Sequence, residues 1–321
     1  MVSTGEHKFL SQLRRRVGPR TAGLRLGMGD DCAILRPQRS SEVVVTTDLM
    51  LEGVHFRRDW HTAEQVGHRC LARGLSDLAA MGARPLAAFL SLAVSHADLA
   101  GRPSWADRFL DGLLALAGAH KVPLAGGDLA EAPAALVVAD IVLTGTVPAG
   151  RALLRSVARR GDAVYVTGSL GGAAAELAAL QRGDRAPAYV PQPRVVVGEA
   201  LVRRGLASAC IDLSDGLSTD LNHLCEESGV AAEIDAAALP IHRLAQESVD
   251  AMELALHGGE DYELLFTAPE KVRVPRSIAG VPIRRIGDIT SVRKGGPRVS
   301  VLIDGKTQAL EAGGWEHFGK R

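Results

Sequence analysis

The spacing of apolar and polar positions predicts alternating strands and helices in the first half of the chain. The β-branched run at residues 43–47 predicts a buried strand that delivers Asp48 at its C-terminal end. From residue 63 to residue 81 apolar side chains recur at helical spacing, and a glycine and a proline that follow mark the end of this helix. We therefore expect Asp77 in the last turns of the helix.

Two further strands, at residues 86–94 and 136–147, flank an amphipathic helix at residues 108–120. We interpret the first 148 residues as a β-α-β-β-α-β-like order, which favours an α+β domain with helices on one face of a sheet. A Pro-Ala-Gly sequence then favours a domain boundary. We expect two domains, at residues 1–148 and 149–321.

The second half predicts an α/β domain. Its predicted strands and helices are strands 163–167, 263–267, 281–289 and 299–303, helices 173–181 and 194–204, and a helix through Leu217, Leu221 and Leu224 that stops at Gly229. Either Ser214 or Asp215 is predicted to cap that last helix. The GSLGG turn before residue 173 allows two interpretations, a phosphate cradle or a plain tight turn, and a lone glycine cluster favours the plain turn.

Length and charge narrow the class of protein. At 321 residues the chain exceeds the roughly 250 to 300 residues at which a single hydrophobic core stops growing, which supports two domains. The 37 basic and 37 acidic residues balance, so no global field favours nucleic acid or an anionic membrane. We expect neither as a partner.

The four cysteines form no CxxC pair and no spacing typical of metal ligands, and a chain of this size needs no disulfides. A reducing compartment fits this pattern best. No run approaches about 18 apolar residues, and the N-terminal stretch has no apolar signal core. We therefore expect a soluble, cytoplasmic protein.

Six aspartates carry the strongest chemical signal. Each lies in a short segment of glycine, serine, threonine or aliphatic residues, and none has a Lys or Arg in its immediate flank; they are Asp31, Asp48, Asp77, Asp128, Asp212 and Asp215. Carboxylates at the edges of apolar elements are costly to bury alone and are usually paired or bound to metal. Oxygen ligands in this number fit Mg²⁺ ions and the phosphates that they carry.

Several missing motifs argue against other phosphate-handling and hydrolytic classes. The chain has no GxxxxGK[ST], no HRD and DFG pair, no GxSxG and no HExxH. What remains is a set of dispersed carboxylates with glycine-rich turns. This set suits phosphoryl transfer, because that reaction needs mainly positioning and neutralisation of phosphate charge.

A run of motifs then resembles one family. In order, the motifs are GMGDDC, VVVTTDLMLEGVHF, LARGLSDLAAMGARP, AGGD, RALLRS followed by RRGD, ACIDLSDGLSTDLNHL and GGEDYELLF. Their order resembles that of thiamine-monophosphate kinases, whose superfamily also holds aminoimidazole ribonucleotide synthetase and selenophosphate synthetase. The resemblance spans nearly the whole chain. It implies a homodimer, an N-terminal α/β domain that binds metal and ATP and pairs across the dimer, a C-terminal α/β domain that completes the ATP and substrate site, and an ATP cleft between the two domains.

The resemblance also implies site residues. Several Mg²⁺ ions would be held by Asp31, Thr46, Thr47, Asp48, Asp77, Asp128, Asp212 and Asp215. ATP would be contacted by Gly127, Asp128, Arg155 and Ser214, and thiamine monophosphate by His55, Glu260 and Trp315. The implied reaction is direct in-line transfer of the γ-phosphoryl group of ATP to thiamine monophosphate. No catalytic base is implied, because the acceptor phosphate, with a second pKa near ~6, is largely dianionic at neutral pH.

Structural alternatives stay open for several of these residues. The ring of Trp315 suits a thiazolium cation, yet the same residue could anchor the C-terminal tail. Asp215 could be only a helix cap, and His55 only a half-exposed histidine after a turn. Asp220 and Asp261 have ordinary explanations, on a helix surface and at a strand edge, and we assign them no chemical role.

Two other classes of protein also stay open. One is another ATP-using member of the superfamily, although a selenophosphate synthetase would need a reactive cysteine before Cys32, and an aminoimidazole ribonucleotide synthetase would not predict HGGEDYELLF with a terminal Trp. The other is a non-catalytic Mg²⁺-nucleotide binding protein. One departure from the family concerns Asp128, which is followed by Leu129 and Ala130 where the family often has threonines, so two hydroxyls are absent from that metal site.

Overall fold

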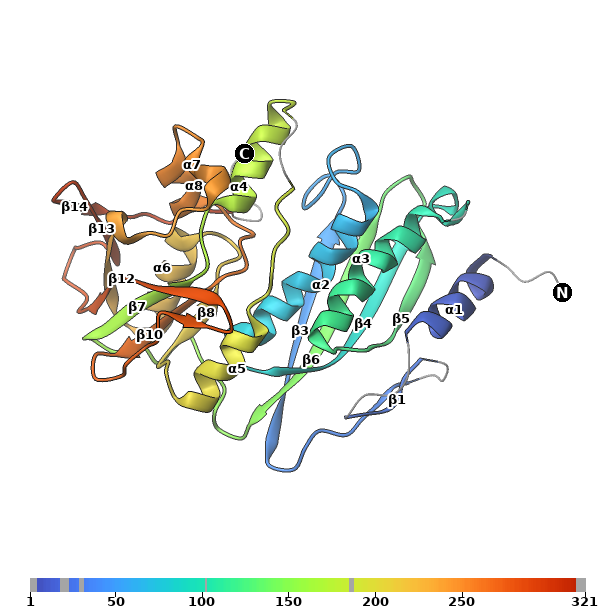
Figure 1. The fold of residues 1–321 in the computed structure, drawn as a ribbon, viewed down its shortest axis with the longest axis horizontal. Coiled ribbons are helices and arrows are strands. Elements are labelled where there is room, and N and C mark those ends of the chain that lie inside the picture. Colours follow the sequence, from blue (N-terminus) through green and yellow to red (C-terminus); the bar gives the residue numbers. More distant parts are fainter. Residues whose placement is uncertain (1–4, 18–22, 29–31, 102, 185–187, 316–321) are drawn as a thin grey trace. The chain divides into compact units, whose positions relative to one another are not determined.

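The computed structural model describes residues 5–17, 23–28, 32–101, 103–184 and 188–315. The chain divides into two compact units, the first comprising Met1–Leu78 and Ala83–Gly150, and the second Ala79–Gly82 and Arg151–Arg321. Both units combine sheets with helices (Figure 1), which confirms the predicted mixed α/β class.

The first unit is built around a four-stranded sheet. Its helices and strands are α1 (Gly5–Arg16), β1 (Leu24–Leu26), β2 (Ile34–Leu35), β3 (Ser41–Leu51), α2 (Ala63–Ala80), β4 (Arg84–Val94), η1 (His96–Leu99), α3 (Trp105–His120), β5 (Leu124–Glu131) and β6 (Val138–Pro148). The sheet order is β3-β6-β4-β5, with β4 and β5 parallel and the other pairs antiparallel. The predicted order of this half was wrong, because β5 was not foreseen and the observed order from β3 onward is β-α-β-α-β-β.

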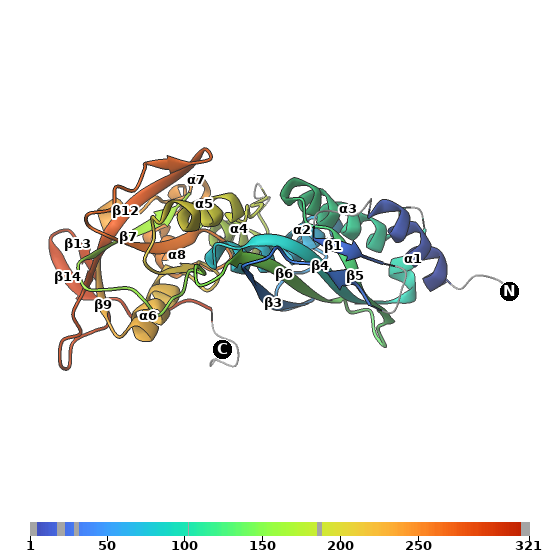
Figure 2. The ribbon, with the colours of Figure 1, turned by 90° about the horizontal axis from the view of Figure 1, so that it is seen from below.

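Helices α2 and α3 cover one face of this sheet (Figure 2), as predicted. The two helices approach so closely that their backbones touch at glycines. A Cβ added to Gly67 of α2 would lie 1.8 Å from the carbonyl oxygen of Phe109, and one added to Gly112 of α3 would lie 1.9 Å from that of Glu64. Glycine at both positions is therefore required for the observed helix spacing.

Residues 43–47 form a strand, as predicted, but the prediction that this strand is buried was wrong. Strand β3 extends to Leu51, so Asp48 lies inside the strand, and exposed side chains alternate with less exposed ones along it. Val43 is 47% exposed and Val45 65% exposed, while Met50 on the alternate set is 1% exposed. The β-branched run reflects strand propensity, and only the helices on one side decide which half of its side chains is buried.

The second unit contains a larger, mainly antiparallel sheet. Its helices and strands are β7 (Asp162–Thr167), α4 (Gly172–Gln181), α5 (Val195–Arg204), β8 (Cys210–Asp212), α6 (Leu217–Ser228), β9 (Ala231–Asp235), η2 (Ala236–Ala238), α7 (Arg243–Gln246), α8 (Ala251–His257), β10 (Leu264–Pro269), β11 (Ser277–Ile278), β12 (Val281–Thr290), β13 (Val299–Ile303) and β14 (Lys306–Ala309). The strand order is β14-β13-β9-β12-β7-β10-β8, with β11 paired to β12. The parallel pair is β13 with β9.

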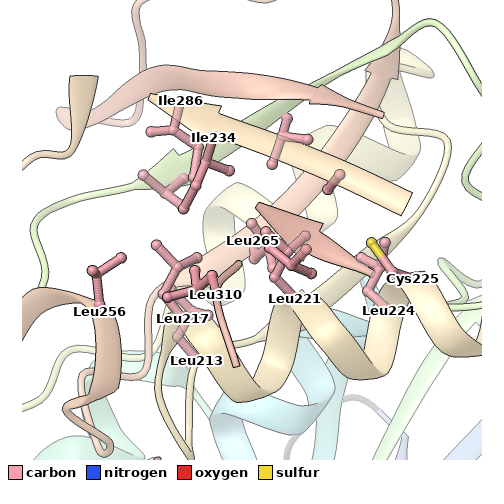
Figure 3. Close-up of a cluster of buried hydrophobic side chains, with 14 of the residues drawn as sticks. Leu213, Leu217, Leu221, Leu224, Cys225, Ile234, Leu256, Leu265, Ile286 and Leu310 are labelled. Carbon is pink, nitrogen blue, oxygen red and sulfur yellow. The ribbon is translucent and has the colours of Figure 1, made fainter. Parts of the chain in front are cut away.

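The core of the second unit forms where α6 packs on this sheet. Leu221, Leu224 and Cys225 of α6 face Ile234 of β9 and Leu265 of β10 (Figure 3), and all five are buried. Their helical spacing along α6 is the periodicity that predicted this helix. The core therefore fixes the position of the segment between β8 and α6, which holds several predicted site residues.

Across the described residues, every helix is too short or too polar to cross a lipid bilayer.

Candidate functional site

Two predicted metal ligands lie between β3 and α2 in the first unit. The hydroxyl of Thr46 donates a hydrogen bond to Oδ2 of Asp77, which α2 presents to the sheet. A Cβ added to Gly74, three residues before Asp77, would lie 2.6 Å from Leu143 Cδ1 and 3.6 Å from Thr46 Cγ2. The glycine thus lets α2 come close enough for this contact.

Asp48 lies on the same face of β3 and has an ion partner that sequence reasoning missed. Arg73 of α2 approaches Oδ1 of Asp48 through Nε at 3.2 Å and through a terminal nitrogen at 3.1 Å. The absence of a flanking Lys or Arg in the sequence was therefore no guide to the pairing in space. A helical spacing of four residues from Asp77 places Arg73 one turn earlier on the same side of α2, and this was the available signal.

Two other predicted ligands of this unit, Thr47 and Asp128, lie on the opposite face of the sheet. Thr47 donates a hydrogen bond from its hydroxyl to Oδ1 of Asp140 on β6, at 2.9 Å. Asp128 on β5 lies beside Ser91 of β4, and both are exposed. Because side chains alternate along a strand, Thr47 faces away from Thr46 and Asp48. Asp140 is an additional carboxylate that the sequence analysis did not single out.

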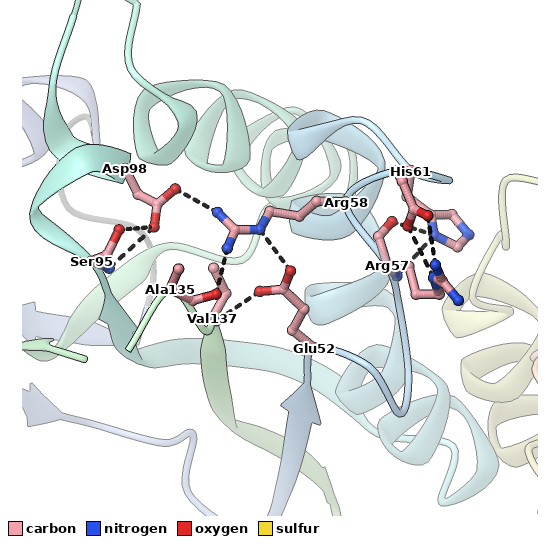
Figure 4. Close-up of polar contacts among 9 residues, drawn as sticks. Glu52, Arg57, Arg58, His61, Ser95, Asp98, Ala135 and Val137 are labelled. Atoms are coloured by element: carbon pink, nitrogen blue, oxygen red, sulfur yellow. Dashed lines mark hydrogen bonds and ion pairs between the residues drawn. The ribbon is translucent and has the colours of Figure 1, made fainter. Parts of the chain in front are cut away.

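His55 belongs to the loop that follows β3. Its Nδ1 accepts a hydrogen bond from the backbone N–H of Leu51 at 3.0 Å. The loop is held by the guanidinium of Arg58, which donates to Oε1 of Glu52 at 2.7 Å, to Oδ1 of Asp98 at 2.6 Å and to a backbone oxygen (Figure 4). This network gives the loop a defined shape on both sides of His55.

In the second unit, Asp212 ends β8 and the turn that follows leads into α6. Two predictions about this region were wrong: that Ser214 or Asp215 caps α6 with its side chain, and that Asp220 lies on the helix surface. The N-cap of α6 is Gly216, without a side-chain cap, and Oδ2 of the buried Asp220 accepts the backbone N–H groups of Ser214, Asp215 and Gly216 at 3.1 Å each. Asp220 reaches back from the first turn of the helix to shape the preceding turn.

Burial raises the pKa of Asp220 well above its ordinary value, and the negative charges of Asp212 and Asp215 raise it further. Three carboxylates thus share a small volume at the start of α6. Together with His223, two of them could hold a cation, because ligand atoms of Asp215, Asp220 and His223 all lie within 4.8 Å of one another.

The C-terminal segment and the residues before β10 converge on the same turn. The backbone N–H of Trp315 donates to the carbonyl of Asp215 at 3.0 Å, and that of Glu260 donates to the carbonyl of Ser214 at 2.8 Å. A Cβ added to Gly314 would lie 1.9 Å from the Asp215 carbonyl oxygen, so only glycine permits this approach. The fold therefore brings Ser214, Asp215, Glu260 and Trp315 together from distant parts of the sequence.

The GSLGG turn is a plain turn, the interpretation that the sequence favoured. The N-terminus of α4 is already capped from within the protein, because the carboxylate of Asp261 accepts the N–H of Gly171 at 2.6 Å and that of Ala173 at 3.2 Å. The predicted strand-edge role for Asp261 was wrong, since this residue is buried and precedes β10.

Arg155, predicted to contact ATP, lies in the second unit with an exposed side chain, and its carbonyl accepts a hydrogen bond from the hydroxyl of Ser228 at 2.7 Å. Gly127 lies in β5, where a Cβ would lie 1.8 Å from the Leu90 carbonyl oxygen. Asp31 lies outside the described residues. Each unit therefore gathers its own group of predicted residues, Thr46, Asp48 and Asp77 in the first and Asp212, Ser214, Asp215, Glu260 and Trp315 in the second.

Comparison with known families assigns a class to this architecture. Residues 29–147 match the family described as AIR synthase related protein, N-terminal domain, and residues 159–300 match AIR synthase related protein, C-terminal domain. A structure described as hydrogenase maturation protein HypE in complex with ATP shares the fold, with a TM-score of 0.78 over 97% of this chain at 18% identity. The chain is thus built from the two domains of the AIR synthase related class.

Similar proteins narrow this class further. The thiamine-monophosphate kinase of Escherichia coli strain K12 is 38% identical over 99% of each chain, and that of Bacillus subtilis is 33% identical over 94% of this chain and 97% of its own. The crystal structure of thiamine-monophosphate kinase from Stenotrophomonas maltophilia has a TM-score of 0.80 at 37% identity, covering 97% of this chain and 98% of that chain. A structure described as AaThiL complexed with AMPPCP and TMP has a TM-score of 0.75 at 29% identity, covering 98% and 97%. The chain belongs to the thiamine-monophosphate kinase family, which confirms the resemblance.

Proposed function

We propose that the chain catalyses ATP-dependent phosphorylation of thiamine monophosphate to thiamine diphosphate, by direct in-line transfer of the γ-phosphoryl group. The observation that carries this proposal is similarity over almost the full length of both chains to thiamine-monophosphate kinases, at up to 38% identity. A relative in this family has been solved with the ATP analogue AMPPCP and TMP. The carboxylates and hydroxyls gathered in each unit are the donor types that this reaction uses.

The acceptor explains why no catalytic base is assigned. A phosphate monoester has a second pKa near ~6 and is largely dianionic at neutral pH, so it attacks without prior removal of a proton. The enzyme has to hold two phosphate-bearing substrates in line and to screen their mutual repulsion.

The donor set fits Mg²⁺, a hard cation that prefers oxygen ligands. We propose that several ions are held by the eight residues that the family resemblance implies, Asp31, Thr46, Thr47, Asp48, Asp77, Asp128, Asp212 and Asp215. The pair formed by Thr46 and Asp77 and the group of carboxylates at the start of α6 support this. Bound Mg²⁺ would neutralise charge on the transferred phosphoryl group. Arg73 contacts Oδ1 of Asp48, so an ion held by Asp48 would share this carboxylate with the guanidinium.

For ATP we propose contacts from Gly127, Asp128, Arg155 and Ser214. The exposed guanidinium of Arg155 suits a phosphate, to which it can donate two parallel hydrogen bonds. Gly127 lets β5 run close beside β4, as the 1.8 Å approach of an added Cβ shows. We propose that the first domain, residues 1–148, binds metal and ATP, and that residues 149–321 complete the ATP and substrate site.

For thiamine monophosphate we propose His55, Glu260 and Trp315. Trp315 is 45% exposed, which leaves surface for a thiazolium cation. Glu260 is half-buried and can accept hydrogen bonds from the amino group of an aminopyrimidine. Both residues are tied to the turn at Ser214 and Asp215, which supports their acting together.

We also propose a homodimer formed through the face of the first sheet opposite α2 and α3. Val43, Val45 and Leu49 of β3 project from that face and are 47%, 65% and 48% exposed. Aliphatic side chains in a row on an open sheet are typical of a surface that another protein covers. Light scattering should therefore give twice the chain mass, and Val45→Glu should shift the mass toward the monomer. Val249→Glu is the matched control, because Val249 is 100% exposed on the other unit.

We propose a cytoplasmic location, because the four cysteines are free thiols. Burial raises the pKa of the Cys70 thiol to about 12 and that of Cys225 to about 12, so both remain protonated and unreactive.

The decisive experiment is to incubate the purified chain with ATP and thiamine monophosphate, with and without Mg²⁺, and to follow thiamine diphosphate and ADP directly. Mg²⁺-dependent formation of both products in equal amounts is expected. ATP binding without either product would refute the kinase assignment and favour another superfamily substrate or a non-catalytic binding role.

A further inference from the structure

The segment before β10 has an unusual backbone. Glu260 has φ of 65° and Tyr262 has φ of 52°, although neither is glycine. Left-handed φ is unfavourable for residues with a Cβ, and it persists where the surrounding structure imposes it. Such conformations are concentrated at functional sites, and Glu260 is the residue that we assign to the acceptor substrate.

The residue between these two, Asp261, supplies the restraint on one side. Its carboxylate accepts the N–H groups of Gly171 and Ala173 at the N-terminus of α4, at 2.6 and 3.2 Å. Its backbone carbonyl accepts the hydroxyl of Tyr189 at 2.9 Å. Asp261 is 2% exposed, so these bonds form in a nearly water-free environment where they hold the backbone firmly.

The restraint on the other side comes from the turn that follows β8. The backbone N–H of Glu260 donates to the carbonyl of Ser214 at 2.8 Å, and that of Tyr262 donates to the carbonyl of Leu213 at 2.9 Å. The segment is therefore held on two sides. Its backbone N–H groups bind the turn, and the side chain of Asp261 binds α4. One left-handed residue on each side of Asp261 gives the backbone geometry that satisfies both sets of bonds.

The remaining acidic residue of the segment is also committed to structure. Glu263 is buried, accepts the hydroxyl of Thr167 at 2.6 Å and pairs with Arg194, whose Nε donates to Oε2 at 2.6 Å. Among the three acidic residues from 260 to 263, Glu260 is thus the half-buried one. Its carboxylate lies 3.5 Å from the hydroxyl of Tyr262.

We propose that Asp261 is a positioning residue for the acceptor substrate, because its bonds to α4 hold Glu260 in the conformation that receives the aminopyrimidine. This inference rests on the proposed function. A carboxylate that only capped α4 would affect stability and would leave the balance between the two substrates unchanged. A positioning residue affects the acceptor much more than ATP.

The test compares Asp261→Asn with the wild-type enzyme. The asparagine is almost isosteric, but it replaces one acceptor oxygen by an N–H₂ group that faces a backbone N–H, so at least one of the two bonds is lost. We expect the KM for thiamine monophosphate to rise at least tenfold and its dissociation constant, measured by calorimetry without turnover, to rise in parallel. The KM for ATP should stay within twofold of wild type. Asp235→Asn is the matched control, since Asp235 is an exposed cap that accepts the N–H of Ala237 at 2.9 Å.

Three outcomes would overturn the inference. In a folded Asp261→Asn protein, the first is an unchanged KM for thiamine monophosphate. The second is an equal increase in the KM values for thiamine monophosphate and ATP, and the third is a loss of stability with both KM values unchanged. If this variant does not fold, Tyr189→Phe provides a second test, because it removes only the hydroxyl that contacts the Asp261 carbonyl. It should raise the KM for thiamine monophosphate two- to tenfold, and an unchanged KM would also overturn the inference. A wild-type protein that does not phosphorylate thiamine monophosphate would instead refute the proposed function.

Discussion

Replacing Gly67 by alanine tests whether the contact between α2 and α3 sets the position of the first unit's site. The added Cβ would lie 1.8 Å from the Phe109 carbonyl oxygen, and real Cβ atoms essentially never approach closer than 3.0 Å. The obstacle is backbone, which cannot rotate away as a side-chain end can. Overpacking of this kind costs about 1 to 3 kcal/mol, or more. The better helix propensity of alanine offsets only about 1 kcal/mol of that.

Because the obstacle is backbone, we take the upper end of that cost and expect Gly67→Ala to lower the free energy of unfolding by about 2 kcal/mol. Gly118→Ala is a control of opposite sign, because Gly118 lies in α3 with no atom within 4 Å of an added Cβ. That variant should gain up to about 1 kcal/mol from helix propensity alone. Urea denaturation followed by tryptophan fluorescence is suitable when Trp315 is replaced by phenylalanine, because the remaining tryptophans, Trp60 and Trp105, both belong to the first unit.

Gly67→Ala should also lower kcat, because a displaced α2 would carry Asp77 away from Thr46. Equal stabilisation by Gly67→Ala and Gly118→Ala would refute this explanation, because it would mean that α2 and α3 can move apart without loss of stability. A loss of stability with unchanged kcat would instead separate the helix contact from the position of Asp77.

Three further predictions follow from individual side chains. Asp48→Asn should abolish phosphoryl transfer and weaken Mn²⁺ binding measured by electron paramagnetic resonance while leaving the circular dichroism spectrum intact; wild-type turnover would contradict the metal role. Trp315→Ala should raise the KM for thiamine monophosphate about two- to thirtyfold, the equivalent of about 0.5 to 2 kcal/mol of cation–π attraction, and an unchanged KM would assign the ring to the tail. Burial raises the pKa of Asp261 from 3.8 to about 7, so the stability contributed by its neutral form is complete below about pH 4 and is lost as the pH rises to about 7. Between pH 5 and pH 8 the free energy of unfolding should fall by about 3 kcal/mol more in the wild type than in Asp261→Asn. An equal change in both proteins would exclude this titration.

Local patterns predicted most of the helices well. The 3.6-residue periodicity and the glycine stop placed α2 at 63–81, against Ala63–Ala80 in the structure. Glycine-rich and Asp-rich segments also marked the turn before α6 and the segment before β10. These signals are local, because helix periodicity and turn chemistry depend on residues within a few positions of one another.

Strand environments and strand order were predicted less well. The run at residues 43–47 was identified as a strand, but its burial was wrong, and β5 was not foreseen. A strand's exposed face depends on which side the helices cover, and that depends on contacts between residues far apart in the sequence. The same holds for the pairing of Asp48 with Arg73, which α2 and β3 create together.

The sequence by itself determined the family, through the order and content of its motifs, together with the residue types that can bind Mg²⁺ and phosphate. Only the tertiary structure decided what each acidic residue does within the fold: Asp220 shapes the turn before α6, and Asp261 joins α4 to the segment that carries Glu260. Both residues looked ordinary in sequence because their partners are backbone N–H groups. Those groups carry no side-chain signature, and only folding brings them within hydrogen-bonding distance.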